Sequence, residues 1–432
     1  ASNVSVGTYA LDANTTADNN TAVGYASLGA NTTGTRNTSV GSLALSTATT
    51  ADNNTAVGYD ALGDVTTGAN NTAMGDRAGD KLTTGAANTA IGASALGTST
   101  TADNNTAIGY AALDANTTGH SNTGIGKSAL AANTTGSNHT AVGLGALDAN
   151  TTSAANSAFG RDSLGANTTG DDNVALGYAA LFSNTTADNN TGVGYKALYA
   201  NTTGAGNTAL GMRALTANTT ASNNISIGKD SMYANTTGAS NVAVGLSALQ
   251  NNTTASNNTA VGYTALFANT TGSENVAVGF QALNTATTAA NNTSVGHNAL
   301  FNATTGAGNV AIGKSAGENT TTGPNNVFIG LNAGKSLTTV EDNIAIGKDA
   351  LDGASSASTS QTIAIGTQAA SGALAGHNNI AIGYQSMLVA TSAFLNTAVG
   401  NQTLMALTTG DNNVAIGKST LAANTTAGDN TG

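Results

Sequence analysis

The sequence predicts an all-β protein, a parallel β-solenoid (β-roll) of about 25 coils that all have the same length. A glycine that follows an apolar residue recurs at a constant spacing of seventeen positions, from Gly7 and Gly24 to Gly347. After one step that is two positions longer, the series resumes at Gly366 and ends at Gly417. A fixed short period of this kind is typical of solenoids. Helices are disfavoured, because Gly, Asn and Thr are abundant and a unit of this length holds at most one helix with its connections.

We call each of these glycines the marker glycine, use it to name its coil, and number the other residues of the coil from it. A coil of this length suits two strands. The residue at position −1 is Val or Ile in 21 of 25 coils, and the residue at position +4 is Leu in 19. Stacked from coil to coil, these two positions are expected to form two internal files and thus the core.

Position −2 holds Ala, Ser or Gly in every coil except the one with Phe328. In a strand this position points away from the side on which position −1 lies. A face open to water would accept long polar residues at some of its coils. We therefore expect the small residues to be covered by another surface, most simply an identical chain.

Paired threonines occupy positions +8 and +9 in 22 coils, and Asn precedes 13 of these pairs. The Asn and the Gly or Ala after the pair suit turns with positive φ, and stacked Thr and Asn side chains can bond to their copies in neighbouring coils. Asn-Thr-Thr also matches the sequon for N-glycosylation. Turn chemistry is the favoured interpretation.

We interpret residues 1–432 as a single solenoid array cut at both ends from a longer protein. Residues 3–347 are regular repeats, 348–366 form a coil with two extra residues, and 367–432 repeat less regularly. Where position +4 is Gly79 or Gly334, a Leu three residues later is expected to refill the interior, whereas Gly317 has no such replacement. At about 4.8 Å per coil, 25 coils would make a rod of about 120 Å.

Composition narrows the possible partners. The chain has 23 acidic and 12 basic residues and a net charge of −11, which opposes binding to nucleic acid or to anionic membranes. No apolar run approaches the ~20 residues of a membrane helix, so we expect no insertion into a membrane. Cysteine is absent, which excludes disulfides and thiolate metal sites but leaves the compartment open.

No catalytic constellation is expected, because the four histidines, His120, His139, His297 and His377, occupy unrelated positions in distant coils. We therefore predict no enzyme activity, no cofactor and no metal site, and no ligand-binding residue can be assigned. Aspartates share position −6 in non-adjacent coils, which allows weak Ca²⁺ sites, although solvated turn residues are favoured because the Gly-Gly-x-Gly-x-Asp repeat of calcium β-rolls is missing. These are Asp18, Asp52, Asp103 and Asp188.

Seven tyrosines directly follow a marker glycine and allow a stripe on which sugars could stack, although packing at the edge of the sheet is favoured. They are Tyr25, Tyr59, Tyr110, Tyr178, Tyr195, Tyr263 and Tyr384. An ice-binding solenoid is a minor alternative, since adjacent threonines in a strand point to opposite sides.

The segments Asn309-Val310-Ala311-Ile312-Gly313 and Asn413-Val414-Ala415-Ile416-Gly417 resemble the head repeats of YadA-type trimeric autotransporter adhesins. The fuller form Asn-Thr-Ala-Val-Gly-Tyr-x-Ala-Leu is similar to repeat arrays in phage tail-fibre proteins. The resemblance covers essentially the whole chain and implies a left-handed β-roll, a homotrimer, and a place on a cell surface or virion. The coil here is longer than the family's usual repeat, and the shared motif is scaffold, so no binding residue carries over.

Together these features predict the structural shaft of an extracellular fibre or adhesin, which extends and presents a receptor-binding region. Attachment to a host-cell glycan or protein would then lie in flanking regions. The alternative is that the solenoid itself is a glycan-binding adhesive module.

Overall fold

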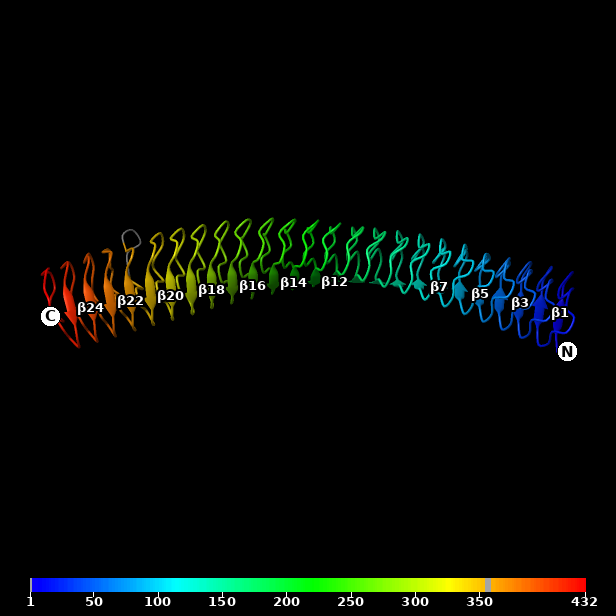
Figure 1. Cartoon of the computed structure of the whole chain (residues 1–432), viewed down its shortest axis with the longest axis horizontal. Coiled ribbons are helices and arrows are strands. Elements are labelled where there is room, and N and C mark those ends of the chain that lie inside the picture. The colour runs from blue at the N-terminus through cyan, green and yellow to red at the C-terminus, as the bar shows by residue number, and fades with distance from the viewer. Residues whose placement is uncertain (1, 354–358) are drawn as a thin grey trace. The chain divides into compact units, whose positions relative to one another are not determined.

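The computed structural model describes residues 2–353 and 359–432, so part of the insertion in coil 366 lies outside the described residues. It confirms a parallel β-solenoid with the expected spacing, and no helix forms within the described ranges. The chain divides into two compact units, Ala1–Arg213 and Ala214–Gly432. In each unit the strands follow one another in chain order (Figure 1).

Each coil contributes one three-residue strand at positions −3 to −1. The strands of the first unit are β1 (Val4–Val6), β2 (Thr21–Val23), β3 (Thr38–Val40), β4 (Thr55–Val57), β5 (Thr72–Met74), β6 (Thr89–Ile91), β7 (Thr106–Ile108), β8 (Thr123–Ile125), β9 (Thr140–Val142), β10 (Ser157–Phe159), β11 (Val174–Leu176), β12 (Thr191–Val193) and β13 (Thr208–Leu210). Those of the second are β14 (Ile225–Ile227), β15 (Val242–Val244), β16 (Thr259–Val261), β17 (Val276–Val278), β18 (Thr293–Val295), β19 (Val310–Ile312), β20 (Val327–Ile329), β21 (Ile344–Ile346), β22 (Ile363–Ile365), β23 (Ile380–Ile382), β24 (Thr397–Val399) and β25 (Val414–Ile416).

Neighbouring strands pair in parallel with equivalent positions opposite each other. Ala243 of β15, for example, lies opposite Ala260 of β16. The two-residue insertion leaves this register intact, because Ile344 of β21 still pairs with Ile363 of β22. The expected stacking of like residues is therefore confirmed within each unit.

The expectation of two strands per coil is wrong, since turns occupy the rest of the coil in place of a second strand. Non-glycine residues at positions +2, +4 and −5 adopt φ near +55°, as Ser247, Leu249 and Asn257 do at +54°, +53° and +62°. These left-handed residues bend the chain repeatedly, which interrupts any regular strand. Positive φ thus falls at other positions than the Asn of the Asn-Thr-Thr segment.

The marker glycine is required for two reasons. Gly109 has φ of +136°, and a Cβ added to it would lie 2.6 Å from the carbonyl oxygen of Gly126 in the next coil. Only glycine adopts this backbone conformation without strain, and only glycine leaves room for the backbone of the next coil.

The assignment of the two strand faces is corrected by the structure. From β2 onward, the residue at position −2 points inward and is buried, as Ala243 and Ala260 are. The aliphatic residue at position −1 points outward and stays partly exposed, with Met74 at 49% and Ile312 at 41%. The small residues are therefore covered by their own chain and carry no argument for a partner.

The narrow interior explains this orientation. At Gly192, which occupies position −2, an added Cβ would lie 3.2 Å from Cγ of Leu181 and 3.3 Å from the carbonyl oxygen of Ala197. The site accepts a methyl group but no branched side chain. Serine also fits, because its hydroxyl donates to the carbonyl at position +3, as Ser226 does to Ser231 at 2.9 Å.

The leucines at position +4 form the expected internal file. Every Leu at this position from Leu28 to Leu404 is fully buried. Leu82 and Leu337 are also buried, in agreement with their predicted replacement role. The structure also explains Gly317, because an added Cβ would lie 2.5 Å from Cδ2 of Phe328. The Phe328 ring enters the interior from β20 and occupies the space that leucine fills in other coils.

Buried asparagines join the coils at position −4. The backbone N–H of Asn275 donates to Oδ1 of Asn258 at 3.0 Å, and its Nδ2 donates to the same oxygen at 3.2 Å and to the carbonyl of Ala289 at 2.8 Å. Position +8 adds a second file, in which the Thr253 hydroxyl donates to the carbonyl of Thr270 at 3.0 Å. The Thr ladder was expected, and so was an Asn ladder at the Asn-Thr-Thr segments, which forms at position +7, where Asn252 Nδ2 donates to Asn235 Oδ1 at 2.7 Å. The Asn ladder at position −4 was not predicted.

Candidate functional site

Each unit presents the outward face of its strands along its surface. We call the side chains at positions −3 and −1 the outer face. They are mostly Thr, Val and Ile, and they are exposed or half-buried in both units. An all-parallel sheet is normally covered on both faces, so an outer face whose position −1 is apolar in every coil is a candidate interaction surface.

The four histidines do not converge. His120 is exposed, His297 stacks on Phe280 with ring centroids 4.9 Å apart, and His377 contacts Phe394 edge to face at 4.9 Å. Only His139 is buried. The described residues include no group of three or more His, Asp or Glu side chains that could hold a metal ion.

His139 takes the place of an asparagine in the ladder at position −4. Its Nδ1 accepts the backbone N–H of Asn156 at 3.1 Å, so the proton of the neutral ring lies on Nε2, which donates to the carbonyl of Ser153 at 2.8 Å. Burial lowers the pKa of His139, while its hydrogen bonds with Ser153 and Asn156 oppose this shift. The ring thus reproduces the acceptor and donor of Asn as a neutral group.

The aspartates at position −6 are used within the stack. Oδ1 of Asp52 accepts the N–H of Thr35 at 2.6 Å, Oδ1 of Asp103 accepts that of Ala86 at 2.7 Å, and Asp188 does the same for Asp171 at 2.8 Å. These contacts fit the interpretation as turn residues, and they join each coil to the one before it. Sequence reasoning did not foresee this role.

The tyrosines after the marker glycines behave in two ways. Where neighbouring coils both carry an aromatic ring at position +1, the rings stack, as in Tyr178 and Tyr195, whose centroids are 5.5 Å apart at 13°. Ring faces in such pairs cover each other. Tyr25 instead meets Tyr9 of the preceding coil edge to face, with centroids 5.8 Å apart. Tyr25, Tyr59 and Tyr110 stay 54%, 48% and 60% exposed, and only Tyr110 of these three has a cation near its ring, Lys127 Nζ at 6.0 Å from the centroid.

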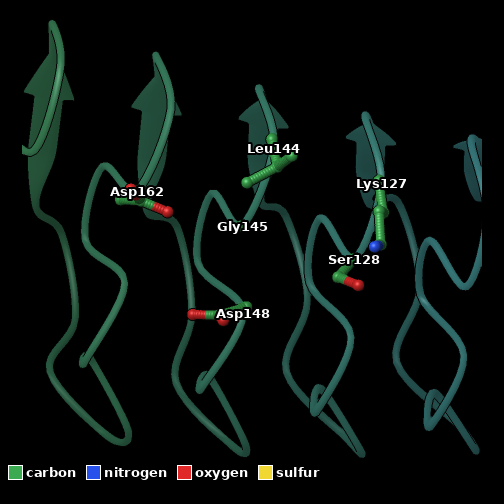
Figure 2. A pocket seen from close by; sticks show the side chains of 6 residues that line it. All are labelled: Lys127, Ser128, Leu144, Gly145, Asp148 and Asp162. Carbon is green, nitrogen blue, oxygen red and sulfur yellow. The ribbon is translucent and has the colours of Figure 1, made fainter.

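A hollow of about 190 Å³ lies beside Gly145 in the first unit (Figure 2). It is lined by Lys127, Ser128, Leu144, Gly145, Asp148 and Asp162. Gly145 is the only glycine at position +2, where every other coil has a side chain. That exception was visible in the sequence and could have pointed to the hollow.

Two carboxylates border this hollow. A Cβ added to Gly145 would lie 3.0 Å from Oδ1 of Asp162 and 3.8 Å from Oδ2 of Asp148. Burial raises the pKa of Asp148, and the neighbouring Asp162 raises it further. The hollow is small and shallow, and both positive and negative side chains line it. We therefore interpret it as a solvated polar depression of the surface.

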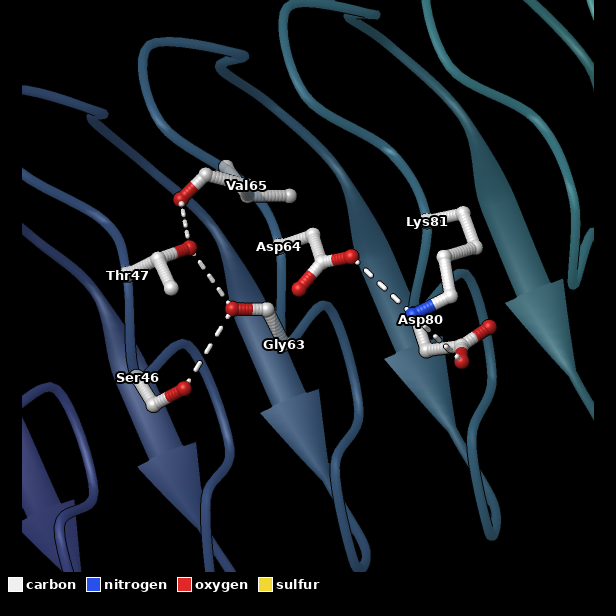
Figure 3. Close-up of polar contacts among 7 residues, drawn as sticks. All are labelled: Ser46, Thr47, Gly63, Asp64, Val65, Asp80 and Lys81. Atoms are coloured by element: carbon white, nitrogen blue, oxygen red, sulfur yellow. Dashed lines mark hydrogen bonds and ion pairs between the residues drawn. The ribbon is translucent and has the colours of Figure 1, made fainter.

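A second charged cluster surrounds Lys81 (Figure 3). Its Nζ lies 3.1 Å from Oδ2 of Asp64 and 3.6 Å from Oδ2 of Asp80, and the hydrogen bond that Lys81 donates to Asp64 raises the pKa of Lys81. Beside it, the Thr47 hydroxyl contacts the carbonyl oxygens of Gly63 and Val65 at 2.7 and 3.0 Å. These contacts link neighbouring coils and indicate a structural role.

No protein-family model matches the chain, and no curated protein sequence matches it. The described residues contain no helix with the length and hydropathy needed to cross a membrane.

Proposed function

We propose that this chain is a structural, self-associating segment of an extracellular fibre or adhesin, on a cell surface or a virion, which holds a receptor-binding region away from its base. The outer face is the observation that supports this most. In each unit its position −1 is apolar in every coil, and the unit's own residues leave it exposed or half-buried. A homotrimer is the assembly that the resemblance to YadA-type heads suggests.

The interior supports the same proposal. Coils are joined by side-chain ladders and backbone hydrogen bonds, and this design adds length coil by coil because each coil contacts only its neighbours. Such an array acts as a spacer without needing an enclosed pocket.

Self-association is tested by the mass of the protein in solution, measured by sedimentation. The wild type is expected to be an oligomer, and the triple variant with Val244→Asp, Val261→Asp and Val278→Asp is expected to dissociate, because carboxylates would be buried in the contact. A matched control places three aspartates in the same coils on the other side, at the exposed residues Thr254, Thr271 and Thr288. A monomeric wild type would contradict the proposal.

A second candidate function, glycan binding by the solenoid itself, is favoured by the exposed rings of Tyr25, Tyr59 and Tyr110. Sugars stack on open aromatic faces. A glycan array on this segment tests it, and specific binding that is lost on Tyr→Ala substitution at these three positions would support an adhesive role. Absence of saturable binding would leave the spacer function alone.

A further inference from the structure

The sequon Asn-x-Thr occurs at a second place in the repeat, outside the Asn-Thr-Thr segment. Here the asparagine is at position −5 and the threonine at position −3, which is the first residue of the strand. Eight coils have this second sequon, six of them in the first unit and two in the second. The asparagines are Asn19, Asn53, Asn70, Asn104, Asn138 and Asn189, then Asn257 and Asn291.

The two kinds of sequon differ in the exposure of the asparagine. At position +7, eleven of the thirteen asparagines are fully buried. At position −5, the asparagines of all eight sequons are exposed. The segment 184–191 holds one sequon of each kind, with Asn184 buried and Asn189 exposed. This short segment therefore allows a direct comparison within one chain.

The side-chain nitrogens of these two asparagines also differ in their hydrogen bonds. Nδ2 of Asn184 donates to Oδ1 of Asn167 and to the carbonyl of Ala187, both at 2.9 Å. The backbone N–H of Asn189 donates to the carbonyl of Asp171 at 3.1 Å, but its Nδ2 has no partner among the described residues. A sugar on Asn184 would break two bonds inside the stack, whereas a sugar on Asn189 would break none.

Both specified residues of the second sequon face solvent, because the residue between them points inward. Asn190 is fully buried at position −4, while Asn189 is exposed and Thr191 of β12 is half-buried. The sequon specifies the asparagine and the threonine and leaves the residue between them open, apart from proline. The folded chain thus presents the two residues that are recognised and encloses the one that is not.

Burial at position +7 decides when a sugar can be added. In an unfolded chain both kinds of sequon are open, and a sugar at position +7 would later prevent the coils from stacking. In the folded chain a buried asparagine is reached only through local unfolding, whereas position −5 is open at all times. Only an enzyme that acts after folding would modify one kind of sequon and spare the other.

We propose that the folded chain is N-glycosylated at the position −5 asparagines that have threonine at position −3. Nδ2 of the asparagine attacks C1 of a sugar carried on a nucleoside diphosphate, and the bond from C1 to the diphosphate oxygen breaks. Nδ2 loses one proton, and the nucleoside diphosphate leaves. The partner is a glycosyltransferase that recognises Asn-x-Thr. Apart from Asn53 and Asn70, the sites are at least two coils, or about 10 Å, apart, which leaves room for a sugar on each.

This modification goes beyond the proposed function and does not require it. Position −5 is not part of the outer face, so the sugars would not occupy the surface proposed for self-association. Position −3 is part of that face, and a copy of the chain that covers it would hide the threonine from the enzyme. Glycosylation therefore comes after folding and before association.

The test incubates the purified full chain with UDP-glucose and a soluble glycosyltransferase specific for Asn-x-Thr, and locates the added hexoses by peptide mass spectrometry. Modification of Asn189 should exceed that of Asn184 by about tenfold or more, because Asn184 becomes accessible only on local unfolding. A synthetic peptide of residues 181–195 contains both sequons without the fold and should be modified at both asparagines. Equal modification of Asn184 and Asn189 in the folded chain would overturn the proposal.

The same reaction on the dissociating variant with Val244→Asp, Val261→Asp and Val278→Asp separates this proposal from the proposed function. Modification of Asn189 in this variant, with or without modification in the wild type, supports the proposal. No modification of Asn189 in either protein, under conditions that modify the peptide, overturns it. Sedimentation of the two unmodified proteins decides self-association separately.

Two substitutions test whether the threonine at position −3 is recognised. Thr191→Ala should abolish modification of Asn189, while Asn138 in another coil keeps its hexose. Val414→Thr completes a sequon at Asn412, which is exposed but has no threonine at position −3 in the wild type, and should add one site. Modification of Asn189 without Thr191, or no gain at Asn412, would contradict recognition of this threonine.

Discussion

At the residue scale, hydrogen bonds between neighbouring coils decide which residue type occupies a position more than solvent exposure does. His139 shows this, because the ring keeps both contacts of the asparagine that it replaces. The buried Asn of an Asn-Thr-Thr segment shows it too: Asn252 Nδ2 donates to Asn235 Oδ1 at 2.7 Å and to the Ala255 carbonyl at 2.9 Å. A glycan attached at this nitrogen would break both bonds, which favours the interpretation as turn chemistry.

His139 makes stability depend on pH. Its pKa is lowered in the folded state, so the folded chain resists protonation while the unfolded chain takes up a proton near pH 6.5. The stability is therefore complete above about pH 6.5 and is lost as the pH falls below it. We expect His139→Asn to remove this part of the pH dependence, measured as the thermal midpoint between pH 7.5 and 5. His120→Asn is the control at an exposed histidine, and an identical effect there would contradict the prediction.

A marker glycine should not tolerate alanine. Gly109→Ala introduces a Cβ at 2.6 Å from the Gly126 carbonyl oxygen on a backbone with φ of +136°, so we expect a loss of about 3 kcal/mol or more in the free energy of unfolding. Gly145→Ala makes the same chemical change at a position where other coils have side chains, and should cost about 1 kcal/mol or less. Denaturant unfolding followed by circular dichroism compares them. Similar losses would refute the reasoning.

At the element scale, a large side chain on strand β20 fills interior space that turn residues at position +4 fill in other coils. Phe328 is the only large residue at position −2, and the two position +4 residues that its ring approaches are Gly317 and Gly334. Sequence reasoning treated Gly317 as uncompensated, because the compensating side chain comes from a strand in the next coil. The ring on the strand thus compensates for the side chains that the glycines in the turns lack.

This exchange predicts strong coupling between Phe328 and Gly317. Phe328→Ala should destabilise by about 3–5 kcal/mol through a cavity, and Gly317→Leu should destabilise through a clash with the ring. The double variant restores the common Ala and Leu pattern, and leucine adopts positive φ at this position in other coils, as Leu300 does at +48°. It should therefore be more stable than Phe328→Ala alone. Additive losses in a double-mutant cycle would contradict the packing exchange.

At the scale of the whole molecule, stability is a sum of coils and their contacts with neighbours. Each unit lacks a single central core and instead repeats the same Leu, Ala and Asn contacts from coil to coil. The number of coils should then be adjustable in whole steps.

Deleting residues 242–258 removes one complete coil and joins Asn241 to Thr259, which leaves every position in register. We expect this variant to keep its circular dichroism spectrum and to melt within a few degrees of the wild type. Deleting residues 242–249 removes about half a coil and should cause a large loss of stability and new proteolytic cleavage near the junction, because the inward and outward positions no longer match. Equal tolerance of both deletions would refute the repeat as the unit of stability.

The sequence by itself determined the solenoid, the length of its step, the marker glycines, the internal leucines and the ladders of Asn and Thr, because a strict period places like residues over each other. Tertiary structure alone decided which strand face points inward, where Phe328 packs and what His139 bonds to. Alternation says only that Val at −1 and Ala at −2 point opposite ways. The space left inside by the turn residues decides that alanine is enclosed and the aliphatic file is left outside, where a second chain can cover it.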